Sequence, residues 1–399
     1  MSLLTPRRPR PPGSPPRLLV AVTDSQSFLL LRGQLAAAKR AGFDVIALSA
    51  PGEIASRVSA EEGVEHVPVP MDRGFAVVGD LVALWHITAA LRRHRPDVVD
   101  ASTPKAGLLL AVAGWATRVP ARVHTLWGLR FETMDGARRR LLTFLTWVTC
   151  RLAHRVICVS ESLRLRAIEC GVVDQEHAVV LGAGSCNGLD ERSFARTAER
   201  TAAGSALRER LGIPPSSCVI GFVGRIALDK GVGELAAAWR VLRQSWPELH
   251  WIVVGREDDT DPVPTDVLAE MAADPRCHLL GQLDDVAIAY AAMNLLVLPT
   301  YREGFGNVLI EAAAMERPTV ATEVTGCVDA VEDGVTGTLV PPRDPTALAA
   351  AIDRYVTDPE LRHRHGIAGA ARARLLFGQQ VLWDRKHDEY RRVLNRTAC

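Results

Sequence analysis

The chain alternates between short continuous apolar runs and longer segments in which apolar residues recur at helical spacing. The runs 18–23 (LLVAVT) and 43–50 (FDVIALSA) are typical of strands that are buried on both faces of a parallel sheet. Between them, residues 28–42 have the pattern of one helix that ends at Gly42. This alternation predicts a doubly wound α/β sheet, whose ligands lie at the carboxyl ends of the strands.

The same alternation starts again after residue 216 with the apolar run CVIGFVG and the helical segment ELAAAWRVLRQ. A polar, Ala-rich stretch separates the two regions. The first residues of the chain are rich in Pro and Arg and contain no acidic residue, a composition that is typical of a disordered tail. The predicted organisation is a tail at 1–16, a first domain at 17–195, a linker at 196–215, a second domain at 216–375 and a C-terminal helix at 376–399.

The most informative stretch follows the apolar run that ends at Pro299. Glu303 begins a glycine-containing loop, Gly304-Phe305-Gly306-Asn307, and Asn307 is predicted to be the N-cap of the helix VLIEAAAME. Backbone N–H groups at a helix N-terminus favour anionic groups or sugar hydroxyls. Glu311, one turn into that helix, can accept hydrogen bonds from a diol such as a ribose.

A second candidate site follows the predicted strand that ends at Gly224. Arg225 and Lys230 lie in Gly-Arg-x3-Asp-Lys-Gly, where this strand gives way to a helix. Two cations at such a position can neutralise the negative charge of a diphosphate. Each charge-assisted contact would contribute roughly 1.5–3 kcal/mol to binding.

Several polar residues of the first domain are candidates for binding an acceptor. Lys105, in Ser-Thr-Pro-Lys-Ala-Gly at the start of a predicted helix, suits an anion such as an acceptor phosphate, or it is an ordinary surface lysine. His124 lies in a predicted strand, where a structural role is the alternative to a role in binding. Arg130 and Glu132 are polar groups in the loop that follows that strand.

Composition excludes several other classes of protein. The net charge of +1 gives no case for a nucleic-acid partner. The eight cysteines form no C-x-x-C and no zinc spacing, so we expect no metal site and a reduced, cytoplasmic protein. Asp259-Thr260-Asp261 is a literal D-x-D, which we interpret as a solvated acidic loop and not as a metal site. No apolar run approaches the ~18 residues of a membrane span, and the N-terminus lacks the apolar segment of a signal peptide.

Residues 137–155 form a predicted helix with an Arg cluster, Arg138–Arg140, and a strongly apolar middle. One interpretation is a core helix whose charged ends extend to solvent, and we prefer it. The other is an amphipathic surface that docks on an anionic membrane.

These motifs resemble those of the retaining glycosyltransferases of family 4, which have the GT-B fold. Glu303 to Glu311 resembles the E-x7-E motif of that family, and Arg225 with Lys230 resembles its pyrophosphate-binding pair. Ser-Thr-Pro-Lys-Ala-Gly around Lys105 resembles a loop of the branch that acts on polysaccharides and lipid-linked sugars. The chain departs from the family at Trp127, where many relatives have a histidine.

The resemblance implies two Rossmann-like domains that face each other across a cleft, an N-terminal one for the acceptor and a C-terminal one for the nucleotide sugar. The last helix would cross back to the first domain. The resemblance further implies that Glu303 lies by the donor sugar and that Glu311 holds the ribose. The loop Gly304–Asn307 would meet sugar hydroxyls or phosphate, and Gly224 would lie beside the donor.

In function, the resemblance implies transfer of a hexose or N-acetylhexosamine from a UDP-sugar, with retention of configuration and without metal or cofactor. The acceptor would be a lipid-linked, polysaccharide-precursor or natural-product molecule, and a polyprenyl-linked acceptor would place the enzyme peripherally on the inner face of the membrane. A UDP-sugar epimerase or a phosphorylase-like enzyme on the same fold, or a non-catalytic nucleotide-sugar-binding protein, remain alternatives. A nicotinamide dehydrogenase is disfavoured, because the glycines at 182–188 do not form the dinucleotide fingerprint.

Overall fold

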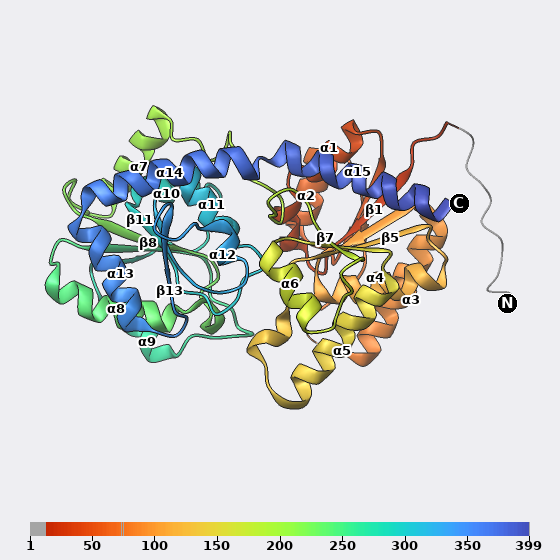
Figure 1. Cartoon of the computed structure of the whole chain (residues 1–399), viewed down its shortest axis with the longest axis horizontal. Coiled ribbons are helices and arrows are strands. Elements are labelled where there is room, and N and C mark those ends of the chain that lie inside the picture. The colour runs from red at the N-terminus through yellow and green to blue at the C-terminus, as the bar shows by residue number, and fades with distance from the viewer. Residues whose placement is uncertain (1–12, 73, 75, 399) are drawn as a thin grey trace. The chain divides into compact units, whose positions relative to one another are not determined.

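The computed structural model of the 399-residue chain describes residues 13–72, 74 and 76–398. Residues 1–12 of the predicted tail lie outside the described residues. Spatial compactness divides the chain into two units, coloured along the chain in Figure 1. Unit 1 contains the described residues up to Thr125 together with Val148–Val156 and the described part of Lys386–Cys399, and unit 2 contains Leu126–Trp147 and Ile157–Arg385. The predicted domain limits at 195 and 216 follow chain order instead, and they stay predictions.

The first half of the chain contributes a seven-stranded parallel sheet in the order β3-β2-β1-β4-β5-β6-β7. Its strands are β1 (Arg17–Ala21), β2 (Asp44–Ser49), β3 (Glu65–Pro68), β4 (Val98–Ala101), β5 (Ala121–Leu126), β6 (Arg155–Cys158) and β7 (Ala178–Val180). The accompanying helices are η1 (Ser25–Leu31), α1 (Gln34–Arg40), α2 (Glu53–Glu62), α3 (Val77–His94), α4 (Pro104–Ala116), η2 (Arg130–Thr133), α5 (Gly136–Leu152) and α6 (Glu161–Glu169). The central strands are apolar and buried, as their composition predicts.

The second half contributes a six-stranded parallel sheet in the order β10-β9-β8-β11-β12-β13. Its strands are β8 (Val219–Val223), β9 (His250–Val254), β10 (Cys277–Leu279), β11 (Leu295–Leu298), β12 (Thr319–Thr322) and β13 (Gly337–Val340). Its helices are α7 (Ala198–Arg210), η3 (Leu228–Lys230), α8 (Val232–Ser245), α9 (Thr265–Ala273), α10 (Ala287–Ala292), α11 (Asn307–Ala314), α12 (Cys327–Ala330), α13 (Pro345–Thr357), α14 (Pro359–Phe377) and α15 (Gln379–Ala398). The predicted doubly wound parallel architecture is confirmed for both sheets.

The order of strands in the second sheet identifies where a ligand is expected. Strand order runs β8, β9, β10 in one direction and β11, β12, β13 in the other, so that it reverses between β8 and β11. Right-handed crossovers on either side of such a reversal place their helices on opposite faces of the sheet, and a crevice opens at the carboxyl ends of the two strands. The loops after β8 and β11 begin at Gly224 and Pro299, and they carry the two candidate motifs.

One local prediction was wrong. The helix expected at 28–42 is interrupted, because Gly33 adopts a left-handed backbone conformation (φ 81°) between η1 and α1. The stretch predicted as a linker contains α7, which packs against α10. Gly204 of α7 permits this contact, since a Cβ atom there would lie 2.7 Å from backbone and side-chain carbons of Ala291.

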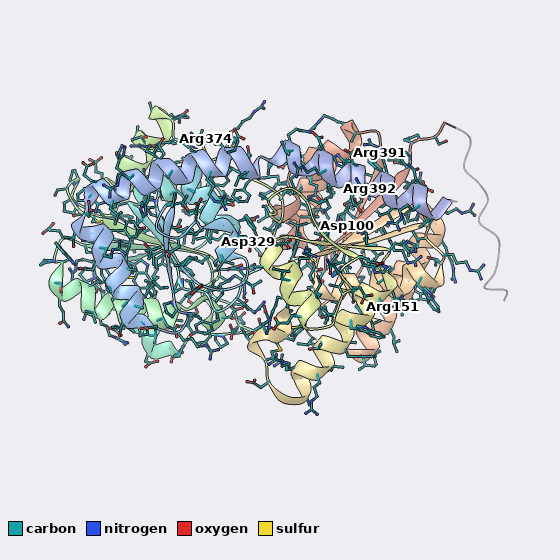
Figure 2. All side chains as sticks on the ribbon, viewed as in Figure 1. Asp100, Arg151, Asp329, Arg374, Arg391 and Arg392 are labelled. Carbon is teal, nitrogen blue, oxygen red and sulfur yellow. The ribbon has the colours of Figure 1, made fainter. Side chains whose placement is uncertain are left out.

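Within unit 1, the end of α15 is fixed to β4 by a buried charged group. The Asp100 carboxylate, labelled in Figure 2, forms an ion pair with Lys386 at 3.0 Å and accepts a hydrogen bond from the Tyr390 hydroxyl at 2.6 Å. Burial opposes ionisation, but the charge of Lys386 and the hydrogen bonds from Tyr390, Lys386 and Thr125 lower the pKa of Asp100 below its usual value. The C-terminal helix is therefore anchored by a carboxylate that stays ionised.

Candidate active site

The loops after β8 and β11 lie directly against each other. Gly231 follows η3 and has φ 68°. If another residue replaced it, the added Cβ atom would lie 2.0 Å from the Pro299 carbonyl oxygen. The Asp229 carbonyl accepts hydrogen bonds from the Tyr301 backbone N–H at 2.8 Å and from the Thr300 hydroxyl at 3.0 Å. These contacts hold the two predicted motifs together, although more than 60 residues separate them in sequence.

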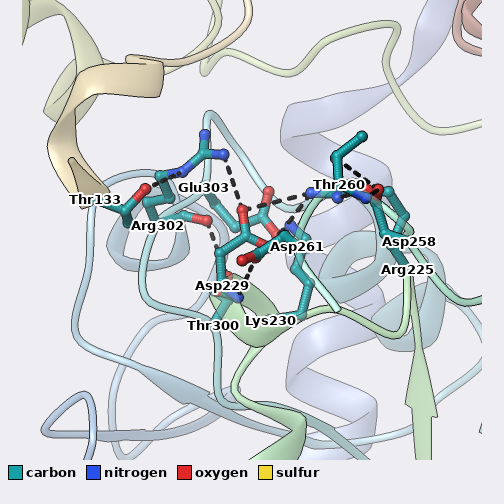
Figure 3. A network of polar contacts seen from close by, with 10 residues as sticks. All are labelled: Thr133, Arg225, Asp229, Lys230, Asp258, Thr260, Asp261, Thr300, Arg302 and Glu303. Carbon is teal, nitrogen blue, oxygen red and sulfur yellow. Dashed lines mark hydrogen bonds and ion pairs between the residues drawn. The ribbon is translucent and has the colours of Figure 1, made fainter. Parts of the chain in front are cut away.

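Lys230 and Glu303, both predicted site residues, form an ion pair between their side chains (Figure 3). Both side chains are largely buried, with exposed fractions of 14% and 17%. Cys327, buried at the start of α12, is near enough to both groups for their charges to influence its pKa, which burial raises well above the ordinary value. The segment at 325–327 therefore lines the same site.

Arg225, the second predicted cation, is engaged by two carboxylates (Figure 3). Its guanidinium pairs with Asp258 and lies 3.3 Å from an Asp229 oxygen. Burial opposes ionisation of Asp258, but hydrogen bonds from Thr260 and the contact with Arg225 outweigh it and lower the pKa of Asp258 to about 2. Arg225 therefore has, in Asp258, a partner that remains charged at neutral pH.

A third cation, Arg302, connects this cluster to another loop. Its guanidinium pairs with Asp229 at 2.8 Å and donates a hydrogen bond of 3.2 Å to the Thr133 hydroxyl, at the end of η2. The sequence interpretation did not single out Arg302, Asp229 or Asp258. Asp229 lies inside the Gly-Arg-x3-Asp-Lys-Gly motif, four residues after Arg225, and that spacing could have indicated it.

The D-x-D segment is more than a solvated loop. Asp261 accepts a hydrogen bond from the Asp229 backbone N–H at 2.8 Å, and its own carbonyl accepts one from the Leu228 N–H at 3.0 Å. The neighbouring Asp258 pairs with Arg225, so that this segment supports the loop carrying the two cations. Among the described residues there is no cluster of His, Cys, Asp and Glu side chains suited to a metal ion.

The glycine loop after Glu303 is packed too closely to accept side chains. A Cβ atom on Gly304 would lie 1.9 Å from the Trp127 carbonyl oxygen, and one on Gly326 would lie 2.6 Å from the Gly304 carbonyl carbon. The Ser160 hydroxyl donates a hydrogen bond to the Gly304 carbonyl at 2.7 Å. Trp127 thus approaches the loop through its backbone.

The predicted helix cap at Asn307 was wrong. Gly306, with φ 78°, is the capping residue, and α11 begins at Asn307. The Asn307 side-chain carbonyl instead accepts a hydrogen bond of 3.1 Å from the Ser185 hydroxyl. Phe305 is fully buried and packs edge-on against Phe377, with ring centroids 5.1 Å apart. Phe305 therefore anchors the loop through packing.

Glu311 lies on α11 beside Tyr290 of α10. The Tyr290 hydroxyl donates a hydrogen bond of 2.8 Å to one oxygen of the Glu311 carboxyl group. Burial raises the pKa of Glu311 to about 7, although the hydrogen bond from Tyr290 acts in the opposite direction. Glu311 can therefore change its protonation state near neutral pH.

The four acceptor-side candidates are divided between the two units. Arg130 and Glu132 form part of η2 in unit 2, where Glu132 pairs with Arg166 at 3.2 Å and burial raises its pKa. In unit 1, Lys105 pairs with Asp80 at 2.5 Å. His124 is buried in β5 with its Nδ1 2.8 Å from the Ala101 carbonyl, and burial lowers its pKa, so that the ring is neutral at pH 7. The acceptor roles of these residues stay predictions.

Two parallel α/β sheets, with cations and a glycine loop at the strand reversal of the second, define a glycosyltransferase of the GT-B fold. Family models agree with this class: residues 30–184 match the glycosyl transferase 4-like domain, and residues 217–358 match the glycosyl transferases group 1. The capsular polysaccharide biosynthesis glycosyltransferase CapM of Staphylococcus aureus is 32% identical over 374 residues, which cover 94% of this chain and 96% of CapM. The chain belongs to the group 1, family 4 glycosyltransferases.

Other relatives match in part or in fold alone. A D-inositol 3-phosphate glycosyltransferase of Salinispora arenicola is 37% identical over 186 residues, which cover 44% of this chain and 42% of that protein. HepE of Anabaena, crystallised with UDP and glucose, has a TM-score of 0.77 at 22% identity and covers 93% of this chain and 98% of its own. Sucrose-phosphate synthase of Thermosynechococcus elongatus has a TM-score of 0.78 at 20% identity, and the match covers 96% of this chain and 100% of that chain.

Within the part of the chain that the structure describes, none of the helices combines the length and the apolar character that a membrane span requires.

Proposed function

We propose that this glycosyltransferase moves a hexose or N-acetylhexosamine from a UDP-sugar to a lipid-linked precursor of a polysaccharide, with retention of configuration. The observation that carries the proposal is the meeting of Arg225, Lys230 and Glu303 at the strand reversal of the second sheet. The presence of UDP in the HepE crystals supports the nucleotide. The role that its name gives CapM, in capsular polysaccharide biosynthesis, supports the class of acceptor.

The proposed chemistry uses the cations to stabilise the leaving group. As the bond between the sugar C1 and the diphosphate oxygen breaks, negative charge grows on UDP, and preorganised Arg225 and Lys230 lower the energy of that state. The acceptor oxygen bonds to C1 on the face that the diphosphate leaves, and the acceptor proton passes to the leaving phosphate. Two side-chain cations can supply the charge that a divalent metal supplies in other glycosyltransferases.

In this proposal, donor binding exchanges partners within the site. The diphosphate replaces Glu303 at Lys230 and competes with Asp258 and Asp229 for Arg225. Glu303, once released, can accept hydrogen bonds from hydroxyls of the donor sugar. Glu311 holds the ribose diol through the carboxylate oxygen that Tyr290 does not occupy.

The proposal is tested by incubating the purified protein with a series of UDP-sugars and a polyprenyl diphosphate-linked sugar acceptor. Release of UDP and a new glycosidic bond with the donor's anomeric configuration are expected, and the reaction should proceed in EDTA. The same UDP-sugars without acceptor test for epimerisation. An epimerised sugar nucleotide, an inverted product, or UDP binding without turnover with any acceptor would contradict the proposal.

A further inference from the structure

A surface pocket of about 570 Å³ lies along α5, and none of the proposed donor-site residues lines it. Its walls include Arg139, Arg140, Thr143, Phe144 and Trp147, which recur at intervals of three and four residues and so share one face of the helix. Val172, buried after α6, also lines the pocket. All these residues belong to unit 2.

The pocket lies within an exposed apolar patch, formed by Leu141, Phe144 and Trp147, whose side chains are 50%, 57% and 43% exposed. The rings of Phe144 and Trp147 are stacked, with centroids 5.8 Å apart. Two other side chains of α5, Leu142 and Cys150, are buried. The preferred interpretation of this segment as a core helix therefore holds for only some of its side chains.

The first turn of α5 is basic. Arg138, Arg139 and Arg140 are all exposed, Arg139 and Arg140 line the pocket, and none of the three forms an ion pair within the described residues. The segment Gly136–Leu152 contains no acidic residue. Of the acidic residues around this segment, Asp135 directly precedes α5, and Glu132 and Glu169 are both paired with Arg166, at 3.2 and 2.6 Å. The arginines are therefore available to an external anion.

We propose that this face of α5 docks on an anionic lipid bilayer, with a lipid phosphate in the pocket between Arg139 and Arg140 and acyl chains beside Phe144 and Trp147. A soluble phosphate would satisfy the arginines but would leave three large apolar side chains in water, whereas a bilayer accommodates both groups. Aromatic side chains are favoured at the depth of the headgroups, and basic residues near an anionic leaflet each add to the attraction.

This docking surface is independent of the donor chemistry proposed above. It would bring a glycosyltransferase to the surface where a lipid-linked acceptor is held. If the protein binds vesicles but transfers no sugar, the docking surface stands and the proposed function fails. If it transfers a sugar but does not bind vesicles, the proposed function stands and the docking surface fails.

The test is co-sedimentation of the full-length protein with vesicles of phosphatidylcholine alone or mixed with phosphatidylglycerol, without substrates. We expect binding only to the anionic vesicles, weakened by salt. The pair R139Q/R140Q should bind about 10- to 30-fold more weakly. The matched pair R92Q/R93Q, exposed on α3, removes the same charge and should bind as the wild type does.

A second pair of variants tests the apolar part of the patch. F144S/W147S should lose vesicle binding, whereas L375S, which changes an exposed apolar side chain on α14, should retain it. Circular dichroism verifies that each variant is folded. The proposal is overturned by absence of binding to anionic vesicles, by equal losses in both arginine pairs, by full binding of F144S/W147S, or by complete competition from soluble glycerol phosphate.

Discussion

Lys230 pairs with Glu303, a residue 73 positions further along the chain, and the two side chains join the loops after β8 and β11. The pair shows that Lys230, the cation that the sequence predicts to bind phosphate, has a carboxylate of the protein as its partner. In the proposed function, a donor diphosphate must compete with this carboxylate. The ion pair therefore fixes the position of the Lys230 side chain. It also opposes donor binding, because the pair must break before Lys230 can contact the diphosphate.

Replacing Lys230 with Gln should lower kcat/KM for the UDP-sugar by about 10- to 150-fold, because a charge-assisted contact to the leaving diphosphate is lost. The variant K39Q, on α1, is the control and should retain wild-type turnover. Steady-state kinetics with varied donor measure the effect. Turnover of K230Q at the wild-type level would remove Lys230 from the phosphate site.

Donor binding should depend on pH through Glu311. A carboxylate accepts two hydrogen bonds from a ribose diol more readily than a protonated carboxyl, so that the KM for the donor should fall as pH rises through about 7. In Y290F the transition should move to higher pH, because the hydrogen bond that favours the ionised form is lost. The variant E311Q should show no transition in this range; a transition that persists in E311Q belongs to another group.

The raised pKa of Glu311 also predicts how the free energy of unfolding varies with pH in the absence of ligand. The folded state holds the Glu311 proton up to about pH 7, whereas an unfolded chain releases it near 4.5, so that stability falls as pH rises through this interval. This interval of about 2.5 pH units corresponds to a loss of at most about 3.4 kcal/mol. The stability of E311Q should not show this decrease with rising pH. Thermal unfolding of the wild type and E311Q between pH 4.5 and 8 measures the two dependences on pH.

Gly304 should tolerate no side chain. In G304A the new Cβ atom would meet the Trp127 carbonyl oxygen at 1.9 Å, and displacement of the loop should abolish transfer. Gly233, at the start of α8, has open space around it, and G233A should retain activity and gain about 0.5–1 kcal/mol of stability. Transfer assays on the two variants make the comparison, and an active G304A would show that the loop is not fixed.

Lys386 should be essential to the anchoring of α15 in unit 1. In K386M the buried Asp100 carboxylate loses its countercharge, which costs about 3–5 kcal/mol. A lowered midpoint in denaturant unfolding is expected, and K39Q again serves as the control. An unchanged midpoint would mean that Tyr390 and Thr125 suffice to stabilise Asp100.

The fold was predictable from sequence because most of its central strands are short apolar runs that alternate with helical segments, a pattern typical of a parallel sheet covered on both faces. The helix at 28–42 was mispredicted, since Gly33 adopts a left-handed conformation that the apolar pattern does not reveal. Asn307 was mispredicted as a cap because its side chain is taken by Ser185, a distant residue that local capping preferences cannot indicate.

The candidate site was predictable where a motif is local and not where partners come from elsewhere in the chain. Arg225, Lys230, Glu303 and Glu311 lie in compact motifs. Asp258 and Tyr290 become relevant only through contacts 33 and 21 residues away in sequence. Arg302 adjoins a motif residue, but its role depends on Asp229 and Thr133, in loops that folding brings beside it.

The most direct test of the central claim is the thermal shift of the wild type and of R225Q/K230Q with UDP, GDP, ADP, NAD and a series of UDP-sugars, each in EDTA. Selective stabilisation of the wild type by UDP and one UDP-sugar is predicted, with none in the double variant. Stabilisation by NAD alone, stabilisation by UDP that requires a divalent metal, or an equal shift in R225Q/K230Q would contradict the assignment of the phosphate site.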